Sequence, residues 1–294
     1  MSGPVQVTAA GMVGFLPRRP EESHKGDYGK VYILGGKVGY TGAPVLSARA
    51  ALRTGAGLVS LGVPEAIYPI VAGHCLCAMP GPLPCGGDGA LSREALPAVL
   101  KALAGKNAAL IGPGLGRGEG ARETVLGAIE TAPCPLVVDA DGINALCGHI
   151  DVLAGRRDRV SVLTPHGGEF ARLLGRERFD PLSDGAAFAR DTGCILVLKG
   201  HRTLTLLPDG RAFQNTTGNP GMAAGGSGDV LAGMILALLG QGFPPDRAAW
   251  GAVYLHGRAG DLAAQALGEY AMTPADLLEY LPAALKEGEE RNGE

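Results

Sequence analysis

The stretch KVYILGGKVGYTGAPVLSARAALRTGAGLVSLGV, residues 30–63, contains two apolar runs on either side of a segment with helical spacing. The first run, KVYILGG (30–36), is apolar, ends in two glycines and predicts a buried strand. APVLSARAALRTGAG (43–57) places apolar and small residues at helical spacing, and GLVSLGV (57–63) predicts a second strand. A strand, a helix and a strand in this order are typical of a parallel sheet.

The same alternation continues along the chain. We expect strands at 108–114, 135–142, 159–169 and 194–200, a hairpin at 203–215, and helices at 92–104, 119–131 and through most of 229–280. Continuously apolar strands between helices predict an α/β fold, with a mostly parallel central sheet and helices on both faces. No long linker or internal repeat interrupts the pattern, so we expect one domain over 1–294, with frayed ends at about 1–12 and 286–294.

The charge balance and the apolar segments restrict the class of protein. The chain has 26 Lys and Arg against 29 Asp and Glu, which argues against nucleic acid or a membrane as the main partner. No secretory signal is recognisable, and the most apolar segment, 230–240, is too short to span a bilayer. We therefore expect a cytoplasmic protein with reduced thiols. His74, Cys75, Cys77 and Cys85 are a poor zinc pattern, and we expect ordinary buried or loop thiols there.

The segments that follow the predicted strands are rich in Gly, Asp, His and Lys. Ligands of open parallel sheets bind at the carboxyl ends of the strands. Those ends read GGKVGYTGAP (35–44), GPGLGRG (112–118), DADGIN (139–144), TPHGGEF (164–170) and KGHRT (199–203). If they line one edge of the sheet, they form one pocket.

A glycine-rich segment, NPGMAAGGSGDVLAG (219–233), runs directly into a predicted helix. The free N–H groups and the positive end of a helix dipole attract phosphate, and glycines let the backbone approach it closely. Asp229 at this junction either caps the helix or acts as a base that takes a hydroxyl proton beside the phosphate. No Walker A motif is present, and GPGLGRG gives only a partial dinucleotide fingerprint.

Several segments together resemble the NAD(P)H-hydrate dehydratase family of the ribokinase-like superfamily. They are SHKGDYGKVYILGG (23–36), YTGAPVLSARAALRTGAGLV (40–59), IGPGLGR (111–117), VVDADGIN (137–144), TPHGGEFARLL (164–174), LKGHRT (198–203) and NTTGNPGMAAGGSGDVLAG (215–233). The resemblance implies a ribokinase-like fold. It also implies that ADP or ATP, with Mg²⁺, phosphorylates the 6-hydroxyl of the S epimer of hydrated NADH or NADPH, after which phosphate leaves. The resemblance favours ADP as the nucleotide.

The resemblance also assigns roles to residues. It makes Asp229 the catalytic base and gives the backbone N–H groups of the loop to the transferred phosphate. Nucleotide-binding positions map onto Lys199, Gly200, His201, Arg202, Thr203, Asn219, Gly225, Gly226, Ser227 and Gly228. Contacts to the hydrated dinucleotide map onto Ala43, Gly116, His166 and Asp229.

Simpler interpretations remain for these residues. Lys199 at a strand end is often only a solvated charge, His166 a turn residue and Glu169 a helix cap. The family commonly has Pro where Gly167 stands, and this departure predicts a looser turn around His166.

Two further groups carry open alternatives. Asp139 and Asp141, two residues apart at a strand end, are candidate Mg²⁺ ligands or turn and cap residues. His24 and Lys25 in HKGDYG either reach a ligand phosphate or lie in a surface loop.

Two rival functions are a small-molecule kinase of the same superfamily, of the hydroxyethylthiazole or hydroxymethylpyrimidine type, and a non-catalytic nucleotide-binding module. Such kinases should lack HKGDYG and TGAP, and a pure binder has no need of Asp229. Larger family members carry an N-terminal epimerase domain. The length predicts a stand-alone dehydratase. The resemblance implies that it acts with a separate epimerase and forms a homo-oligomer such as a tetramer.

Overall fold

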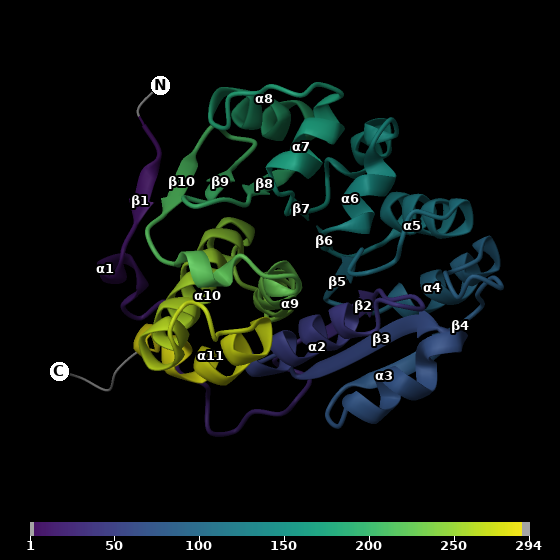
Figure 1. The fold of residues 1–294 in the computed structure, drawn as a ribbon, viewed down its shortest axis with the longest axis horizontal. Coiled ribbons are helices and arrows are strands. Elements are labelled where there is room, and N and C mark those ends of the chain that lie inside the picture. The colour runs from purple at the N-terminus through teal and green to yellow at the C-terminus, as the bar shows by residue number, and fades with distance from the viewer. Residues whose placement is uncertain (1–2, 290–294) are drawn as a thin grey trace.

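Strands of the described chain, residues 3–289 of this computed structural model, form one sheet (Figure 1). They are β1 (Val5–Val7), β2 (Lys30–Leu34), β3 (Leu58–Pro64), β4 (Met79–Leu83), β5 (Ala108–Ile111), β6 (Leu136–Val138), β7 (Ser161–Leu163), β8 (Ile195–Leu198), β9 (Leu204–Leu206) and β10 (Ala212–Asn215). Their order is β1-β10-β9-β8-β7-β6-β5-β2-β3-β4. Only β9 runs antiparallel to its neighbours, which confirms the mostly parallel α/β sheet.

Helices cover both faces of this sheet (Figure 1). The α-helices are α1 (Ala9–Met12), α2 (Gly42–Arg53), α3 (Tyr68–His74), α4 (Leu96–Leu103), α5 (Glu119–Thr131), α6 (Asp141–Leu146), α7 (Gly167–Leu174), α8 (Ser183–Thr192), α9 (Ser227–Gly240), α10 (Pro245–Leu267) and α11 (Pro274–Gly288). Short 3₁₀ turns are η1 (Glu65–Ile67), η2 (Arg93–Ala95), η3 (Ile150–Arg156) and η4 (Pro220–Met222). One apolar core lies between the sheet and α2, α3, α9, α10 and α11, and a second lies between the sheet and α4 to α8.

Helix α9 lies in the first core and packs tightly against α2. All its residues from Val230 to Gly240 are buried. A Cβ on Gly233 would overlap the carbonyl oxygen of Ser47, so only glycine allows this approach. The Ser47 hydroxyl donates to the carbonyl of Ala43 at 3.1 Å and to that of Asp229 at 3.0 Å. The first turns of α2 and α9 are therefore fixed side by side.

The expected alternation is confirmed, although several elements are shorter than expected. The segment 203–215 forms the antiparallel pair β9 and β10, and 119–131 forms α5. The predicted strand at 135–142 contains only Leu136–Val138, because the chain turns into α6 at Asp141. The predicted strand at 159–169 likewise ends at Leu163, before the turn that starts α7.

The chain ends differ from the fraying that their sequence predicted. Val5–Val7 pairs with β10, and Met12 is buried. Near the other end, the N–H of Leu16 donates to the carbonyl of Gly288 at 2.9 Å, and Arg258 makes two 2.7 Å bonds to Glu287. Pairing at the sheet edge and this ion pair hold both ends. Residues 1–2 and 290–294, which the prediction also included, lie outside the described residues.

Within residues 3–289, no helix combines the length and the apolar character that crossing a membrane requires. Cys75, Cys77 and Cys85 are free thiols. No group of three or more His, Cys, Asp and Glu side chains in the described chain is placed to hold a metal ion.

Candidate active site

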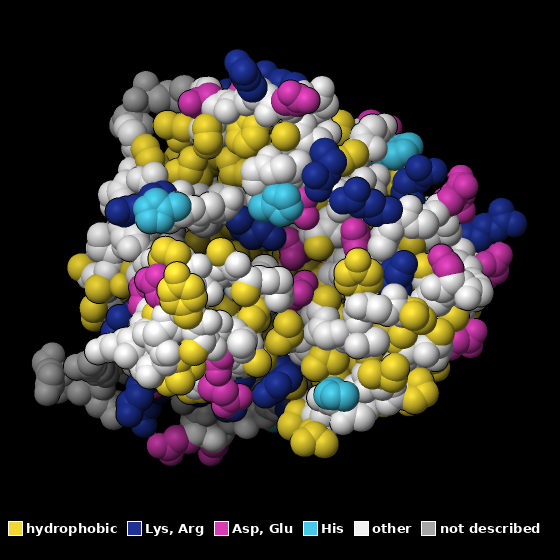
Figure 2. Space-filling view, in the orientation of Figure 1, with side chains coloured by type: hydrophobic (Ala, Val, Ile, Leu, Met, Phe, Trp, Pro, Cys, Tyr) yellow, Lys and Arg dark blue, Asp and Glu magenta, His cyan; other side chains and the backbone are white. Residues whose placement is uncertain are grey.

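A cavity of about 690 Å³ opens where β7 and β8 end and where α9 begins. On the face shown in Figure 2, histidine, basic and acidic side chains gather around a hollow near its centre. The residues that line the cavity are His166, Lys199, Gly200, His201, Thr203, Asn215, Thr217, Gly218, Asn219, Pro220, Met222, Ala223, Ala224, Ser227, Gly228, Leu231, Val253, His256 and Gly257. A pocket is therefore present at the carboxyl ends of β7 and β8, but of the five strand ends expected to form it, only 164–170 and 199–203 contribute lining residues.

Most predicted nucleotide-binding residues lie on this cavity wall. They are Lys199, Gly200, His201, Thr203, Asn219, Ser227 and Gly228, and His166 joins them from the predicted substrate set. Arg202, Gly225, Gly226, Asp229, Ala43 and Gly116 are not among the lining residues. Arg202 is exposed, whereas Gly225 and Gly226 belong to the same loop as Ser227. Ser47 joins the backbones of Ala43 and Asp229.

Asp229 lies in the first turn of α9, but it does not cap the helix. Gly226 is the N-cap residue, with a φ of 109°, and no side chain makes a capping bond there. Burial, and after it the nearby carboxylate of Asp139, raises the pKa of the half-buried Asp229 carboxyl to about 7 against the opposing charge of Lys199. A carboxylate whose pKa lies near neutrality suits proton abstraction, so the geometry favours a base over a cap.

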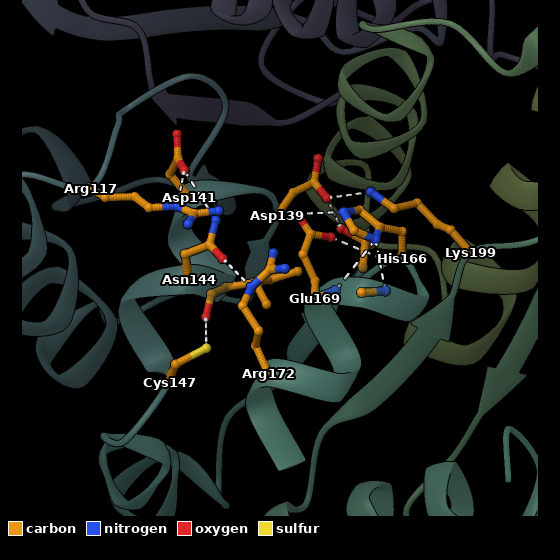
Figure 3. Close-up of polar contacts among 12 residues, drawn as sticks. Arg117, Asp139, Asp141, Asn144, Cys147, His166, Glu169, Arg172 and Lys199 are labelled. Carbon is orange, nitrogen blue, oxygen red and sulfur yellow. Dashed lines mark hydrogen bonds and ion pairs between the residues drawn. The ribbon is translucent and has the colours of Figure 1, made fainter. Parts of the chain in front are cut away.

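Lys199 forms a buried ion pair with Asp139 (Figure 3). The Lys199 Nζ lies 2.8 Å from the Asp139 Oδ1, and the two side chains are 20% and 2% exposed. The same oxygen accepts a 2.7 Å bond from the Thr164 hydroxyl. Burial opposes the charge of Lys199, but Asp139, Glu169 and Asp229 outweigh it and raise its pKa. Lys199 is therefore a fixed cation in the cavity wall, not a solvated surface charge.

Gly228 brings the loop backbone directly against this ion pair. A Cβ at Gly228 would lie 3.0 Å from the Lys199 Nζ and 3.8 Å from the Asp139 Oδ2. The absent side chain therefore lets the backbone at the start of α9 and a lysine ammonium face the same space. Backbone N–H groups at a helix start, with a cation beside them, are suited to bind phosphate.

His166 is the N-cap of α7, in a reciprocal capping box with Glu169. Its Nδ1 accepts bonds from the N–H groups of Gly168 and Glu169 at 3.0 and 3.3 Å, and the Glu169 carboxylate accepts the His166 N–H at 2.9 Å. Because Nδ1 accepts, the neutral ring carries its proton on Nε2. The side chain is 55% exposed and borders the cavity, and its Nε2 lies 3.6 Å from the Glu169 Oε1.

The capping box holds His166 although Gly167 stands where the family commonly has Pro. Gly167 is the first residue of α7, and a Cβ there would meet only the Phe179 ring, at 3.7 Å.

Proline is favoured at the helical position of Gly167. We expect Gly167→Pro to raise the free energy of unfolding by about 0.4–1 kcal/mol, because it restricts the unfolded chain. Urea unfolding measures this. Gly168→Pro is the matched control and should destabilise the protein, because it removes an N–H that His166 accepts.

Asp141 belongs to a second network, drawn on the left of Figure 3. Its Oδ2 accepts the N–H of Gly116 at 2.7 Å, and its Oδ1 accepts from Asn144 at 3.1 Å. Arg117 lies 3.9 Å from the same carboxylate, and Arg172 donates to Asn144 at 3.1 Å. Asp141 therefore holds the GPGLGRG turn, and this geometry gives no support to it as a metal ligand.

Ala140, between the two aspartates, is the one non-glycine residue with positive φ in the described chain, at 51°. Positive φ is energetically unfavourable for a residue with a Cβ atom, and such strained residues cluster at functional sites. The strained turn separates its neighbours: Asp139 joins Lys199, whereas Asp141 joins Gly116. The two carboxylates that looked equivalent in the sequence therefore have different surroundings.

His24 and Lys25 lie near the amino-terminal ends of the strands, on the opposite side of the sheet from the cavity. They precede β2, and the N–H of Gly57, just before β3, donates to the carbonyl of Tyr28 at 2.9 Å. Gly29 abuts the carbonyl of Gly240, at the far end of α9 from Asp229. A helix of this length spans about 20 Å, so His24 and Lys25 do not reach a phosphate bound in the cavity of their own chain. The surface-loop alternative is the correct one within one subunit.

Sequence reasoning did not single out three residues that shape the cavity. Thr217 and His256 line it. Asp261, on α10, accepts the N–H of Gly218 at 3.0 Å and the side-chain amide of Asn219 at 3.1 Å, and so holds the loop. For His256 and Asp261 the sequence offers only polar residues within HGRAGD (256–261), a segment of a mostly apolar helix.

Comparison with known proteins agrees with this geometry. A family model described as NAD(P)H-hydrate dehydratase matches residues 31–283. A bifunctional NAD(P)H-hydrate repair enzyme of Moorella thermoacetica is 46% identical over 97% of this chain, which spans 54% of that protein. The chain thus spans about half the length of this relative. An ADP-dependent (S)-NAD(P)H-hydrate dehydratase of Neisseria meningitidis is 37% identical over 85% of this chain and 82% of its own length.

Solved structures are similar over almost the whole chain. The ADP/ATP-dependent NAD(P)H-hydrate dehydratase of Bacillus subtilis, co-crystallised with ATP and Mg²⁺, has a TM-score of 0.79 and 30% identity, and covers 98% of this chain and 100% of its own. A ribokinase-like superfamily protein of Enterococcus faecalis has a TM-score of 0.84 and 28% identity, with 99% of this chain and 98% of its own covered. The fold is ribokinase-like, and the chain belongs to the NAD(P)H-hydrate dehydratase family.

Proposed function

We propose that this protein is a nucleotide-dependent (S)-NAD(P)H-hydrate dehydratase, with ADP as the preferred phosphoryl donor and ATP as the alternative. The observation that carries the proposal is Asp229, whose pKa burial raises to about 7, at the start of the helix behind the glycine loop. The Neisseria meningitidis relative, named as ADP-dependent, supports the choice of nucleotide.

The proposed chemistry converts a poor leaving group into a good one. Asp229 takes the proton of the 6-hydroxyl, and the freed oxygen attacks the terminal phosphorus of the nucleotide. The new O–P bond forms as the bond to the AMP or ADP leaving group breaks. Phosphate then leaves the ring carbon with its bonding electrons, a ring proton is lost, and the dihydropyridine of NADH or NADPH is restored.

The loop and Lys199 provide the charge that phosphoryl transfer requires. N–H groups of Gly225, Gly226, Ser227 and Gly228 lie at the positive end of α9 and would bind the moving phosphate. Lys199, held at 2.8 Å by Asp139, adds a fixed cation. Because positioning and charge neutralisation supply most of the catalysis in such transfers, these groups fit the reaction.

The residues also fit a Mg²⁺ ion that arrives with the nucleotide. The described chain has no cluster of three or more acidic, His or Cys ligands, which argues against a dedicated metal cage. Nucleotide-bound Mg²⁺ usually has phosphate and water ligands and only one or two carboxylates. Asp139, whose Oδ2 faces the glycine loop, would hold it. The bound ion would neutralise phosphate charge.

The remaining parts of the proposal concern the whole protein. We place it in the cytoplasm, as a single ribokinase-like domain that assembles as a homo-oligomer such as a tetramer. Hydration of NADH or NADPH gives two epimers, so the enzyme would act with an NAD(P)H-hydrate epimerase. The bifunctional repair enzymes among its relatives support this pairing.

The direct test mixes the protein with the S epimer of hydrated NADH, Mg²⁺ and either ADP or ATP. We expect the absorbance of NADH to return, with AMP or ADP released in equal amount, and chelation of Mg²⁺ to abolish the recovery. Parallel reactions with ATP and hydroxyethylthiazole or hydroxymethylpyrimidine test the rival kinases. Phosphorylation of either alcohol without recovery of NADH from the hydrate contradicts the proposal.

A further inference from the structure

His256 is a buried histidine of α10 whose Nε2 has no hydrogen-bond partner in the described chain. The residue is 8% exposed, yet it lines the cavity beside Ser227 and Leu231 of α9. Buried polar atoms without a partner are rare in folded proteins, and each one costs free energy. An imidazole nitrogen without a hydrogen-bond partner, on a residue that lines a cavity, indicates that a bound ligand supplies that partner.

Three other polar side chains of this wall, Thr217, Asn215 and Asn219, have hydrogen-bond partners within the chain. The Thr217 hydroxyl donates to the carbonyl of Tyr254 at 2.8 Å, and the Asn215 amide donates to the carbonyl of Thr217 at 2.9 Å. Asn219 accepts the N–H of Gly221 at 3.0 Å and donates to Asp261 at 3.1 Å. His256 differs from these three residues, because its buried Nε2 has no hydrogen-bond partner among the described residues.

Apolar side chains lie next to His256 on the cavity wall. Val253, one turn earlier on α10, and Leu231 make this part of the wall apolar. A Cβ on Gly257 would overlap the Thr217 hydroxyl, so α10 lies directly against the segment that follows β10. An apolar wall with one polar atom suits a nucleoside better than a phosphate, which needs N–H donors or cations.

The protonation state of the ring agrees with this placement. Burial, with a smaller contribution from the charge of Lys199, lowers the pKa of His256 to about 4, so the ring is neutral at physiological pH. A hydrogen bond with the Ser227 backbone favours the protonated ring, which identifies the partner as the Ser227 carbonyl. Since Nε2 has no partner, Nδ1 donates to that carbonyl and Nε2 is an acceptor. An acceptor does not bind ionised phosphate oxygens.

We propose that His256 is a nucleotide-positioning residue, whose Nε2 accepts a hydrogen bond from the nucleoside half of ADP or ATP, either from a ribose hydroxyl or from the amino group of the base. The inference rests on the nucleotide dependence of the proposed function. It adds a specificity element that holds the nucleoside while the glycine loop and Lys199 hold the phosphates.

The test measures ADP binding by calorimetry without any hydrated dinucleotide. His256→Phe keeps the ring volume but removes the acceptor, and His256→Gln places an amide oxygen near the position of Nε2. We expect His256→Phe to raise the Kd for ADP about tenfold, and His256→Gln to stay within about threefold of the wild type. Equal affinity of the wild type and His256→Phe overturns the proposal, as does an equal loss of affinity in both variants.

Three ADP analogues identify the donor: 2′-deoxy-ADP, 3′-deoxy-ADP and the analogue without the amino group of the base. One of them should bind the wild type more weakly than ADP does, but bind His256→Phe as tightly as ADP does. If the wild type and His256→Phe discriminate all three analogues equally, the assignment to the nucleoside half is wrong.

A measurement on the unaltered protein covers the case in which a variant fails to fold. In ¹⁵N-histidine-labelled wild type, the Nε2 resonance of His256 should shift when ADP saturates the protein, and an unchanged resonance overturns the proposal. Because these experiments omit the hydrate, they are independent of the dehydratase assay. A protein that binds ADP through His256 but restores no NADH would contradict only the proposed function.

Discussion

Replacing Asp229 by Asn is expected to lower kcat for the dehydratase reaction by about 10²–10⁴-fold, which is the usual contribution of a general base. The amide has nearly the same shape but does not take the hydroxyl proton. Nucleotide affinity should change little, because Asp229 is not among the residues that line the cavity. Stopped assays of NADH recovery measure kcat, and calorimetry with ADP measures the affinity.

The pH profile of the wild type provides the matching evidence. A base must be deprotonated to act, and burial raises the pKa of Asp229 to about 7. The rate should therefore fall as the pH falls through about 7, well above the range in which an ordinary aspartate titrates. The residual rate of Asp229→Asn should lack this limb. A limb that persists in the variant would assign the titration to another group.

Stability separates the base from a cap. Asp229 has a folded-state pKa of about 7 against an ordinary value of 3.8, so the unfolded chain loses this proton first as the pH rises. Ionisation of Asp229 therefore opposes folding increasingly between these two values and fully above the higher one. Asp229→Asn should consequently be at least as stable as the wild type at pH 8. A large loss of stability with activity retained would support the capping role.

Replacing Lys199 by Met should lower the free energy of unfolding by about 3–5 kcal/mol, because it leaves the buried carboxylate of Asp139 without its partner. Asp139 is 2% exposed on its side chain, so water does not substitute for the lost ammonium. The variant should also lose nucleotide affinity, and the pKa of Asp229 should rise further, because Lys199 lowers it in the wild type. Urea unfolding gives the stability, and calorimetry gives the affinity.

Two controls define the origin of this loss. The double variant Asp139→Leu with Lys199→Met removes both charges and should recover most of the stability, but not the nucleotide affinity. Lys101→Met, on the exposed surface of α4, should change neither quantity. Equal instability of the single and double variants would show that the cost comes from packing of the lysine stem and not from an unpaired charge.

The sequence could predict the sheet because each strand and helix carries its own local pattern. Apolar runs such as Lys30–Leu34 and helical spacing over Gly42–Arg53 are properties of neighbouring residues. The pairing of β1 with β10 joins residues about two hundred positions apart, and no local pattern reports it. Strand β4, MPGPL, was also missed. Its two prolines argue against a strand in the sequence, although proline is tolerated in an edge strand such as this one.

The candidate site was predictable where a motif carries the chemistry, as in Gly225–Asp229. Asp139 and Asp141 could not be told apart, because the difference depends on the backbone of Ala140 and on contacts with distant segments. His256 belongs to no recognisable motif. Its Nε2 lacks a hydrogen-bond partner only because α9 and α10 pack together around it, which the sequence does not report. The placement of His24 and Lys25, by contrast, could have been predicted from the sequence. In a parallel sheet, residues that precede a strand lie at the opposite end of the strands from residues that follow one.

The contact between the segment before β2 and the end of α9 restricts the residue at position 29. Gly29, in the HKGDYG segment and with a φ of 85°, presses against the carbonyl of Gly240, where α9 ends. Helix α9 is buried from Val230 to Gly240, and its other end carries Asp229 and the glycine loop. A side chain at Gly29 would overlap the Gly240 carbonyl, so the loop or the helix would have to move. Glycine at position 29 therefore lets the segment before β2 lie directly against the end of α9, about 20 Å from Asp229.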